Sequence, residues 1–358
     1  MSLPVLILSM AAVYAVGTLL LRRLALRHLV CTRAFLKPAV FEGEESKMIE
    51  IVRNDRPMII PWLRVESRIS PYIRLGRQDN LHISDDTHCC SIFTLMPYQQ
   101  IRRRHRVKFL HRGEYNLGNA SLTAGDLLGL LEANREQEMD VPVLVYPRLL
   151  EEGELPAPLA QMMNETVQRR QLMTDPFLFR GIRAYQMGDP VRDIHWPATA
   201  RTGETQVRLH DYTAASRLMV IINAEVKNGQ WGDRLADDEQ SVMEYAISIA
   251  ATMCMRALES GVSAGFAANM QLGKGGESAY FPPERDAVTG EKLLAAFARL
   301  HLVRTVRFAT FLETLGDCRG MDVIILSCHD SEEIQAGIHR LKRNGCQAGL
   351  YLVKGGRA

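Results

Sequence analysis

The order of apolar and polar positions divides the chain into a strand-rich first part and a later part where strands alternate with helices. Between residues 38 and 150, short apolar segments are separated by turn-forming clusters, such as the Asn-Asp-Arg-Pro run at 54–57. Short strands without a long amphipathic helix predict a β-sandwich, with an irregular or helical excursion at 122–134. The predicted strands are 48–52, 58–69, 90–96, 107–110 and 141–146.

The pattern changes after residue 147, where an acidic, proline-containing stretch at 151–158 indicates a linker, which we extend to residue 180. Fully apolar strands then alternate with segments of helical spacing, which predicts a parallel sheet covered on both faces. The strands are 218–222, 262–268, 323–326 and 348–353, and the helices are 238–258, 286–300 and 332–344.

The first residues form the longest apolar run of the chain, because residues 3–21 contain no charge. As a helix this run would rise about 1.5 Å per residue and span roughly 28 Å, close to the hydrocarbon thickness of a bilayer. A signal peptide would carry its positive charge before the run, and a buried core helix is the other alternative. The arginines follow the run, at positions 22, 23, 27 and 33. This arrangement predicts a single-pass inner (plasma) membrane protein with its bulk in the cytoplasm.

Composition narrows the function classes. The chain of 358 residues is 47% hydrophobic and 23% charged with a net charge of +2, so it is a globular protein and no nucleic-acid binder. Seven cysteines without a CxxC pair argue against a disulfide scaffold and suit a reducing compartment. His82, His88, Cys89 and Cys90 fit no standard zinc spacing, and we predict neither a metal nor a cofactor.

The most specific text in the chain is the run Arg-Ala-Tyr-Gln-Met-Gly-Asp-Pro-Val-Arg-Asp-Ile-His-Trp at 183–196. Asp189 can accept hydrogen bonds from nearby arginines, and Tyr185 and Trp196 offer large areas for burial with one polar group each. Asp193 and His195 alternate and could form an acid/base or metal pair, although no nucleophile stands in a recognisable context. The candidate residues of this hallmark segment are Arg183, Tyr185, Gly188, Asp189, Arg192, Ile194, His195, Trp196 and Arg201.

This segment resembles the Y-x-x-G-D-x-x-R-x-I-x-W hallmark of the domain-of-unknown-function 58 family. Further similar motifs are Phe-Glu-Gly-Glu at 41–44, Arg-Gly-Glu-Tyr at 112–115, Asp-Leu-Leu-Gly at 126–129 and Val-Tyr-Pro at 145–147. The resemblance implies an α+β multidomain membrane protein. Its expected parts are a membrane anchor (1–30), an immunoglobulin-like β-sandwich (31–150), the linker (151–180), the hallmark segment (181–216) and a von Willebrand factor A-like (Rossmann-like) α/β domain (217–358). Relatives often have two membrane spans, and their genes are commonly found beside those of MoxR-type AAA+ ATPases.

Domains of the A type usually hold a divalent cation with a D-x-S-x-S motif after the first strand. In this chain Asn223 stands at the position of the aspartate, and Glu225 and Lys227 stand at the positions of the serines. Because an amide is a weaker ligand than a carboxylate and an ammonium group repels a cation, we expect a domain that has lost its metal site.

A basic stretch precedes residue 112, with Arg102, Arg103, Arg104, Arg106 and Lys108 and no acid. It is either a solvated strand edge whose charges deter edge pairing, or a surface for anionic lipid headgroups.

The combined features favour a non-catalytic, membrane-anchored interaction or scaffold protein that works with a MoxR-type AAA+ ATPase. The rival hypothesis is an envelope-associated hydrolase that uses Asp189, Asp193 and His195, and a purely structural role is the third.

Overall fold

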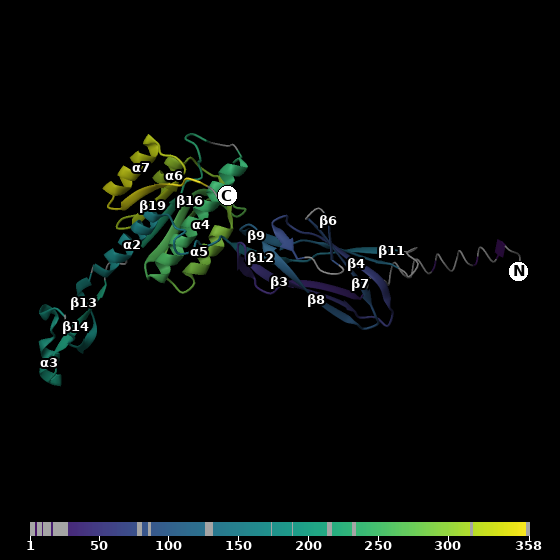
Figure 1. Ribbon diagram of the computed structural model, residues 1–358, viewed down its shortest axis with the longest axis horizontal. Coiled ribbons are helices and arrows are strands. Elements are labelled where there is room, and N and C mark those ends of the chain that lie inside the picture. Colours follow the sequence, from purple (N-terminus) through teal and green to yellow (C-terminus); the bar gives the residue numbers. More distant parts are fainter. Residues whose placement is uncertain are drawn as a thin grey trace. The chain divides into compact units, whose positions relative to one another are not determined.

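The computed structural model describes residues 4–5, 9, 16, 28–76, 81–84, 87–125, 132–172, 174–187, 189–212, 217–230, 234–315 and 318–355. The chain forms two compact units, Met1–Arg148 and Leu149–Ala358 (Figure 1).

The first unit is a β-sandwich, as the strand pattern predicted. One sheet has the order β1 (Leu29–Phe35), β3 (Glu45–Asn54), β8 (Gln100–Phe109) and β5 (Ile73–Leu75). The facing sheet has the order β11 (Glu132–Gln137), β10 (Ala120–Gly125), β4 (Ile60–Arg68), β7 (His88–Leu95) and β6 (Leu81–Ser84). A short third sheet joins β2 (Ala39–Phe41), β12 (Val141–Tyr146) and β9 (Gly113–Leu117).

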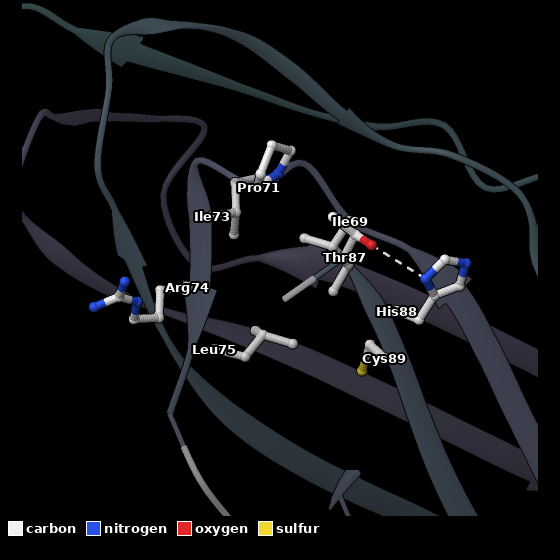
Figure 2. Close-up of a pocket in the computed structure, with 8 residues that line it drawn as sticks. All are labelled: Ile69, Pro71, Ile73, Arg74, Leu75, Thr87, His88 and Cys89. Atoms are coloured by element: carbon white, nitrogen blue, oxygen red, sulfur yellow. Dashed lines mark hydrogen bonds between the residues drawn. The ribbon is translucent and has the colours of Figure 1, made fainter. Parts of the chain in front are cut away.

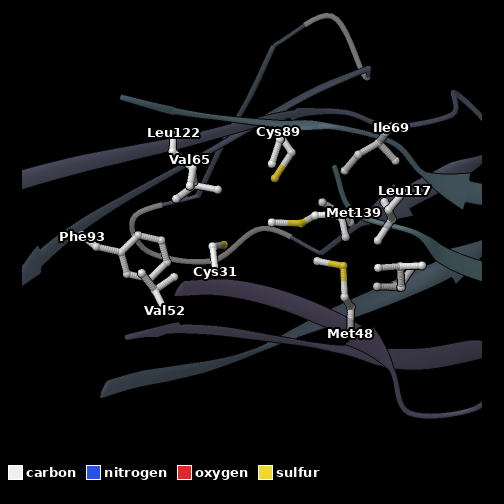
Figure 3. Close-up of a cluster of buried hydrophobic side chains, with 14 of the residues drawn as sticks. Cys31, Met48, Val52, Val65, Ile69, Cys89, Phe93, Leu117, Leu122 and Met139 are labelled. Atoms are coloured by element: carbon white, nitrogen blue, oxygen red, sulfur yellow. The ribbon is translucent and has the colours of Figure 1, made fainter. Parts of the chain in front are cut away.

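Alternate residues of these strands point into a shared apolar core, because successive side chains of a strand face opposite sides of its sheet. Figure 3 shows Cys31, Met48 and Val52 of the first sheet packed with Val65 and Phe93 of the facing sheet.

Charged groups are buried in this core. Arg33 of β1 donates two hydrogen bonds to Glu50 Oε1 of β3, at 2.8 and 2.6 Å, and a third to Ser67 Oγ. His105 Nε2 of β8 lies 3.1 Å from Glu50 Oε2. Burial acts to raise the pKa of Glu50, but the hydrogen bonds of His105 and Arg33 outweigh it and lower that pKa to about 2. A carboxylate in an apolar core is tolerated here because both of its oxygens are hydrogen-bonded.

The second unit contains a mixed sheet with β15 (Arg217–Ile222) at its centre and four parallel strands. After Arg217, every residue of β15 is apolar, so this strand needs cover on both faces. One face packs against α6 and α7, and the other is covered by α4 and α5, where Phe297 stacks on Phe266. The strand order is β17 (Ser278–Glu284), β16 (Ser263–Leu272), β15, β19 (Asp322–Ser327) and β20 (Gln347–Leu352), and β18 (Leu300–Arg304) also pairs with β16. The helices are α4 (Asp237–Glu259), α5 (Thr289–Ala298), α6 (Phe308–Thr314) and α7 (Glu332–Arg343).

The described residues between 149 and 212, part of which we expected to be a linker, form helices and strands. Helix α2 (Ala157–Leu172) buries Leu159, Met163 and Thr166, which lie on one face of the helix. It leads into β13 (Thr174–Ala184), which pairs antiparallel with β14 (Gln206–Tyr212). The connection between them contains the 3-10 helix η1 (Val191–Asp193) and α3 (Trp196–Thr202).

Two predictions about the secondary structure and the strand directions were wrong. The stretch 122–134, expected to be irregular or helical, contributes to strands β10 and β11, with 126–131 outside the described residues. The sheet of the second unit is mixed rather than parallel throughout, because β17 and β18 run antiparallel to β16.

The transmembrane helix of the predicted fold class and the predicted single-pass membrane location are corrected as well. Among the residues that the structure describes, none of the helices combines the length and the apolar character needed to cross a membrane. The longest of them, α4, has 23 residues but begins with three acidic side chains, Asp237, Asp238 and Glu239. Most of the expected span, residues 3–21, lies outside the described residues.

Candidate functional site

The hallmark segment folds into a small local structure, which we call the clasp and define as residues 183–207. Its base is the antiparallel pairing of Arg183 with Val207 and of Ala184 with Gln206. Further along, the Tyr185 amide donates to the Thr205 carbonyl, and the His195 amide donates to the Gln206 carbonyl at 2.8 Å. The 20-odd residues between the two strands are therefore folded back onto β14 rather than left as an open loop.

An ion pair fixes the first turn of the clasp. Arg183 donates to both carboxylate oxygens of Asp189, at 2.7 and 2.6 Å. The Gln186 amide donates to Asp189 Oδ2 at 2.8 Å, and the Asp189 amide donates back to the Gln186 carbonyl. The hydrogen bonds of Arg183 lower the pKa of Asp189, and the same contact raises the pKa of Arg183. Of the three arginines that could pair with Asp189, the structure brings Arg183 to it.

The histidine of the motif caps a helix. His195 Nδ1 accepts a hydrogen bond from the Ala198 amide at 3.0 Å, at the N-terminus of α3. A ring nitrogen that accepts carries no proton, so the neutral ring holds its hydrogen on Nε2. Helix α3 ends at Gly203, whose φ of 76° favours glycine. Thr199 Oγ1 also accepts from the Gln206 amide, which ties α3 to β14.

Four of the other hallmark residues, Tyr185, Arg192, Trp196 and Arg201, are exposed. Tyr185 and Trp196, which we expected to supply buried area, are 40% and 66% exposed, and Met187 and Val191 between them are fully and 69% exposed. The side chain of Arg192 is 86% exposed, and Arg201 is exposed on α3. Ile194 is half-buried and forms an isolated antiparallel β-bridge with Val207, which is buried. Gly188 lies outside the described residues.

The three residues of the hydrolase hypothesis have separate contacts in the clasp. Both oxygens of Asp189 accept from Arg183, and Nδ1 of His195 is used by the helix cap. Asp193 Oδ1 lies 3.9 Å from Nε of Arg192. Asp189 and His195 therefore stabilise the local structure of the clasp.

The expected cation-motif positions lie where the neighbouring strands β15 and β19 end. The connection after β15 leads to β16 on one side, and the connection after β19 leads to β20 on the other. In open α/β sheets this is the usual place for a ligand. Here Asn223 is fully buried, donates to Ser327 Oγ at 3.0 Å and accepts from the Glu225 amide at 2.9 Å. Glu225 Oε1 accepts from the Phe308 amide at the N-terminus of α6, at 2.7 Å. Asn223 Oδ1 and Glu225 Oε1, two oxygens that could face a cation, therefore accept hydrogen bonds within the fold.

Lys227, the third residue of that motif, extends away to an acidic partner. Its Nζ lies 2.8 Å from Glu239 Oε1, and Glu239 Oε2 accepts from the Ala236 amide before α4. The hydrogen bond of Lys227, together with those of Ala236 and Gln230, lowers the pKa of Glu239 to about 2. Among the described residues, no group of three or more His, Cys, Asp or Glu side chains is arranged to hold a metal ion.

None of the sequence motifs points to the buried pair Arg33 and Glu50. Strand parity could have found it, because Glu50 shares the inward positions of β3 with Met48 and Val52.

The cysteine-histidine cluster near residue 89 borders a cavity of about 40 Å³, room for about one water molecule. Figure 2 shows Cys89 among apolar residues of this cavity, whereas His88 bonds its neighbour Thr87 at 3.1 Å and Arg74 points away. Burial raises the pKa of the Cys89 thiol to about 11, so it is neutral and unreactive at physiological pH.

Residues 181–318 match the family described as "Protein of unknown function DUF58". The chain is 24% identical over 253 residues to the uncharacterized protein YeaD of Bacillus subtilis (strain 168). The aligned region covers 68% of this chain and 56% of YeaD. This chain thus spans just over half the length of that curated relative. These matches confirm the resemblance drawn from the hallmark segment, whereas the A-like fold and the ATPase partner stay predictions.

Solved structures with similar strands include the CARDB domain of a Pyrococcus furiosus protein, at 15% identity and a TM-score of 0.20. It covers 32% of this chain and 96% of its own. A cohesin from Archaeoglobus fulgidus has 7% identity and a TM-score of 0.25, over 32% of this chain and 90% of its own. At these scores the similarity carries no argument about function.

Proposed function

We propose that the chain, whose residues 181–318 match the DUF58 family, is a non-catalytic interaction protein that binds a protein partner through its clasp. The observation that carries this proposal is that different residues of the clasp hold its fold and form its exposed surface. Arg183, Asp189 and His195 hold the local structure together, while Tyr185 and Trp196 stay exposed.

The exposed residues are of the kind that dominates protein interfaces. Tryptophan, tyrosine, methionine and arginine are enriched in interface cores, and a few such side chains carry most of the binding energy. Within residues 185–196 the clasp exposes Tyr185, Met187, Arg192 and Trp196. Large apolar side chains in water gain free energy when a partner covers them, about 25 cal/mol per Å² of apolar surface. The clasp therefore fits a partner with an apolar pocket bordered by acidic groups.

The leading partner candidate is a MoxR-type AAA+ ATPase, which is what the family resemblance implies. A clasp closed by its own ion pair and helix cap suits such a role, because a preformed surface loses little conformational entropy on binding. The envelope hydrolase is not favoured by the geometry, since Asp189 and His195 are engaged in the fold.

The test is binding of the purified full chain to the purified MoxR-type ATPases of the source organism, with and without nucleotide. We expect Trp196→Ala and Met187→Ala each to weaken binding at least tenfold while the chain stays folded. The matched controls are Met96→Ala and Val303→Ala, which remove side chains that are each 53% exposed elsewhere and should leave binding unchanged.

Two results would count against the proposal. Failure of every such ATPase to bind in any nucleotide state would remove the named partner. Equal losses in the clasp and control variants would show that the clasp is not the binding surface.

A further inference from the structure

The outer face of the first sheet of the β-sandwich carries a row of cations. In β8, the exposed positions alternate with half-buried and buried ones, so the exposed side chains share the face that points away from the core. After Gln100, the exposed residues are Arg102, Arg104, Arg106 and Lys108. Arg103, grouped with them in the sequence analysis, points the other way, where its guanidinium lies 3.9 Å from the Phe93 ring centroid.

Neighbouring strands add like charges instead of balancing them. Lys47 of β3 lies directly opposite Arg106, and Arg74 of β5 lies directly opposite Lys108. Like charges directly opposite one another in a sheet are destabilising. The acid that faces this row from β3 is Glu45, opposite Lys108.

These cations have few partners within the fold. In the part of the chain that the structure describes, Arg102, Arg106, Lys47 and Arg74 form no ion pair or side-chain hydrogen bond. A solvated strand edge would explain charge at the rim of the sheet, but it does not explain why Lys47 and Arg106 lie opposite one another on the two inner strands, β3 and β8. The arrangement reduces the stability of the sandwich, and an anionic ligand would relieve that cost.

We propose that this basic face, defined as Lys47, Arg74, Arg102, Arg104, Arg106 and Lys108, binds an extended acidic segment of another polypeptide. Alternate residues of β8 are about 6.8 Å apart, which is also the spacing of alternate side chains in an extended peptide. Half-buried Ile49 and Ile51 lie directly opposite Arg104 and Arg102, so the face offers apolar contacts beside its charges. An acidic segment with interspersed apolar residues fits both features.

The face is less suited to nucleic acid. Strands β3 and β8 present no aromatic side chain outward, so single-stranded bases find no stacking surface there. Sequence readout in a duplex needs an element that enters a groove, and a broad sheet face does not. The inference is independent of the clasp, because it concerns the other unit of the chain.

The test uses the purified full chain and a synthetic peptide in which glutamate alternates with valine. We expect salt-sensitive binding that Arg102→Ser/Arg106→Ser weakens at least tenfold. The control Arg68→Ser/Lys274→Ser removes two equally exposed cations elsewhere and should change binding less than twofold. Because the double variant at 102 and 106 removes like-charge repulsion, its Tm should equal or exceed that of the unaltered chain.

Three outcomes overturn the proposal. One is equal weakening by the control, which would mean nonspecific charge attraction. Another is a Tm several degrees lower in the double variant, which would assign these arginines to folding. The third is stronger binding to vesicles of anionic phospholipid or to a single-stranded oligonucleotide than to the peptide, which would assign the face to another class of ligand.

Discussion

Arg183 and Asp189 meet through two hydrogen bonds of 2.7 and 2.6 Å, with the guanidinium on β13 and the carboxylate six residues later in the turn that precedes η1. Paired N–H···O bonds of this kind fix orientation as well as distance. The ion pair therefore sets how the segment carrying Met187 and Val191 leaves the strand. Some residues of the hallmark segment therefore hold its local fold, and others remain exposed on its surface.

The first prediction removes the charge of Asp189. Asp189→Asn should open the turn, because the amide cannot accept from both nitrogens of Arg183 and also from the Gln186 amide. Hydrogen exchange at the Gln186 amide should accelerate, and partner binding by the clasp should fall. Glu204→Gln removes a nearby exposed carboxylate and should change neither quantity. Unchanged exchange at Gln186 in the Asp189 variant would show that the ion pair does not hold the turn.

The second prediction concerns acid. Glu50 has a pKa of about 2 in the fold against 4.5 for the free side chain, so the folded sandwich binds this proton more weakly than the unfolded chain. Its stabilisation is complete above about pH 5 and is lost as the pH falls towards 2. The lost free energy of unfolding is about 3 kcal/mol. Urea unfolding can report it through Trp62 of β4, in a chain whose Trp196 and Trp231 are replaced by Phe.

A pair of variants assigns this loss to Glu50. Glu50→Gln should be less stable at pH 7 and should show a much flatter acid dependence. Glu44→Gln removes a carboxylate from an exposed pair with Lys37 and should keep most of the acid loss. A Glu50→Gln chain with the full acid dependence would mean that another group is responsible.

The sequence was a good guide wherever burial is periodic. Strands β3, β7, β12 and β15 were expected because most of their inward positions are apolar, and α4 was expected from its helical spacing. Helix α2 was taken for a linker because its buried side chains, Leu159, Met163 and Thr166, stand among glutamines and arginines. Strand β17 was missed because it contains two prolines, which are uncommon inside strands.

The candidate site was predicted in its position but less in its chemistry. Composition alone does not decide whether an aromatic side chain is buried, and Trp196 proved exposed on α3, a helix of seven residues that buries none of them. Likewise, the choice of Arg183 as partner of Asp189 depends on the hairpin register, which sequence spacing does not fix. That residues 223–227 are poor cation ligands stays a prediction, and their contacts with Ser327 and α6 join segments 104 and 83 positions apart, which the sequence does not reveal.

The third prediction compares two glycines of the second unit. A methyl group on Gly265 would lie 2.4 Å from the Phe281 carbonyl oxygen, and this backbone cannot move without breaking β16–β17 pairing. Gly265→Ala should therefore cost about 1–3 kcal/mol. Gly349→Ala meets only the flexible end of Met162 and should cost clearly less. Calorimetry of the full chain, read at the transition that Glu50→Gln leaves unchanged, tests this order. Equal losses would contradict it.

The last prediction concerns divalent cations. Asn223 already donates to Ser327 and accepts from the Glu225 amide, and Glu225 Oε1 caps α6, so Asn223 Oδ1 and Glu225 Oε1 both have partners within the fold. We expect the Tm of the second unit to be the same in EDTA and in millimolar Mg²⁺. A bound ion at about 100 times its Kd would add about 2.7 kcal/mol and raise the Tm of a unit this size by roughly 5–10 °C.

Variants at the same positions distinguish a role in the stability of the fold from a role in cation binding. Glu225→Ala should destabilise the second unit by about 1 kcal/mol in EDTA and in Mg²⁺ alike, because it removes the acceptor for the Phe308 amide at the start of α6. Asp330→Ala removes an exposed carboxylate from the loop that follows β19 and serves as the control. A Tm that rises in Mg²⁺ or Mn²⁺, and that no longer rises in Asn223→Ala, would show that these residues do hold a cation. In that case the internal hydrogen bonds of Asn223 and Glu225 would have to rearrange when the ion binds.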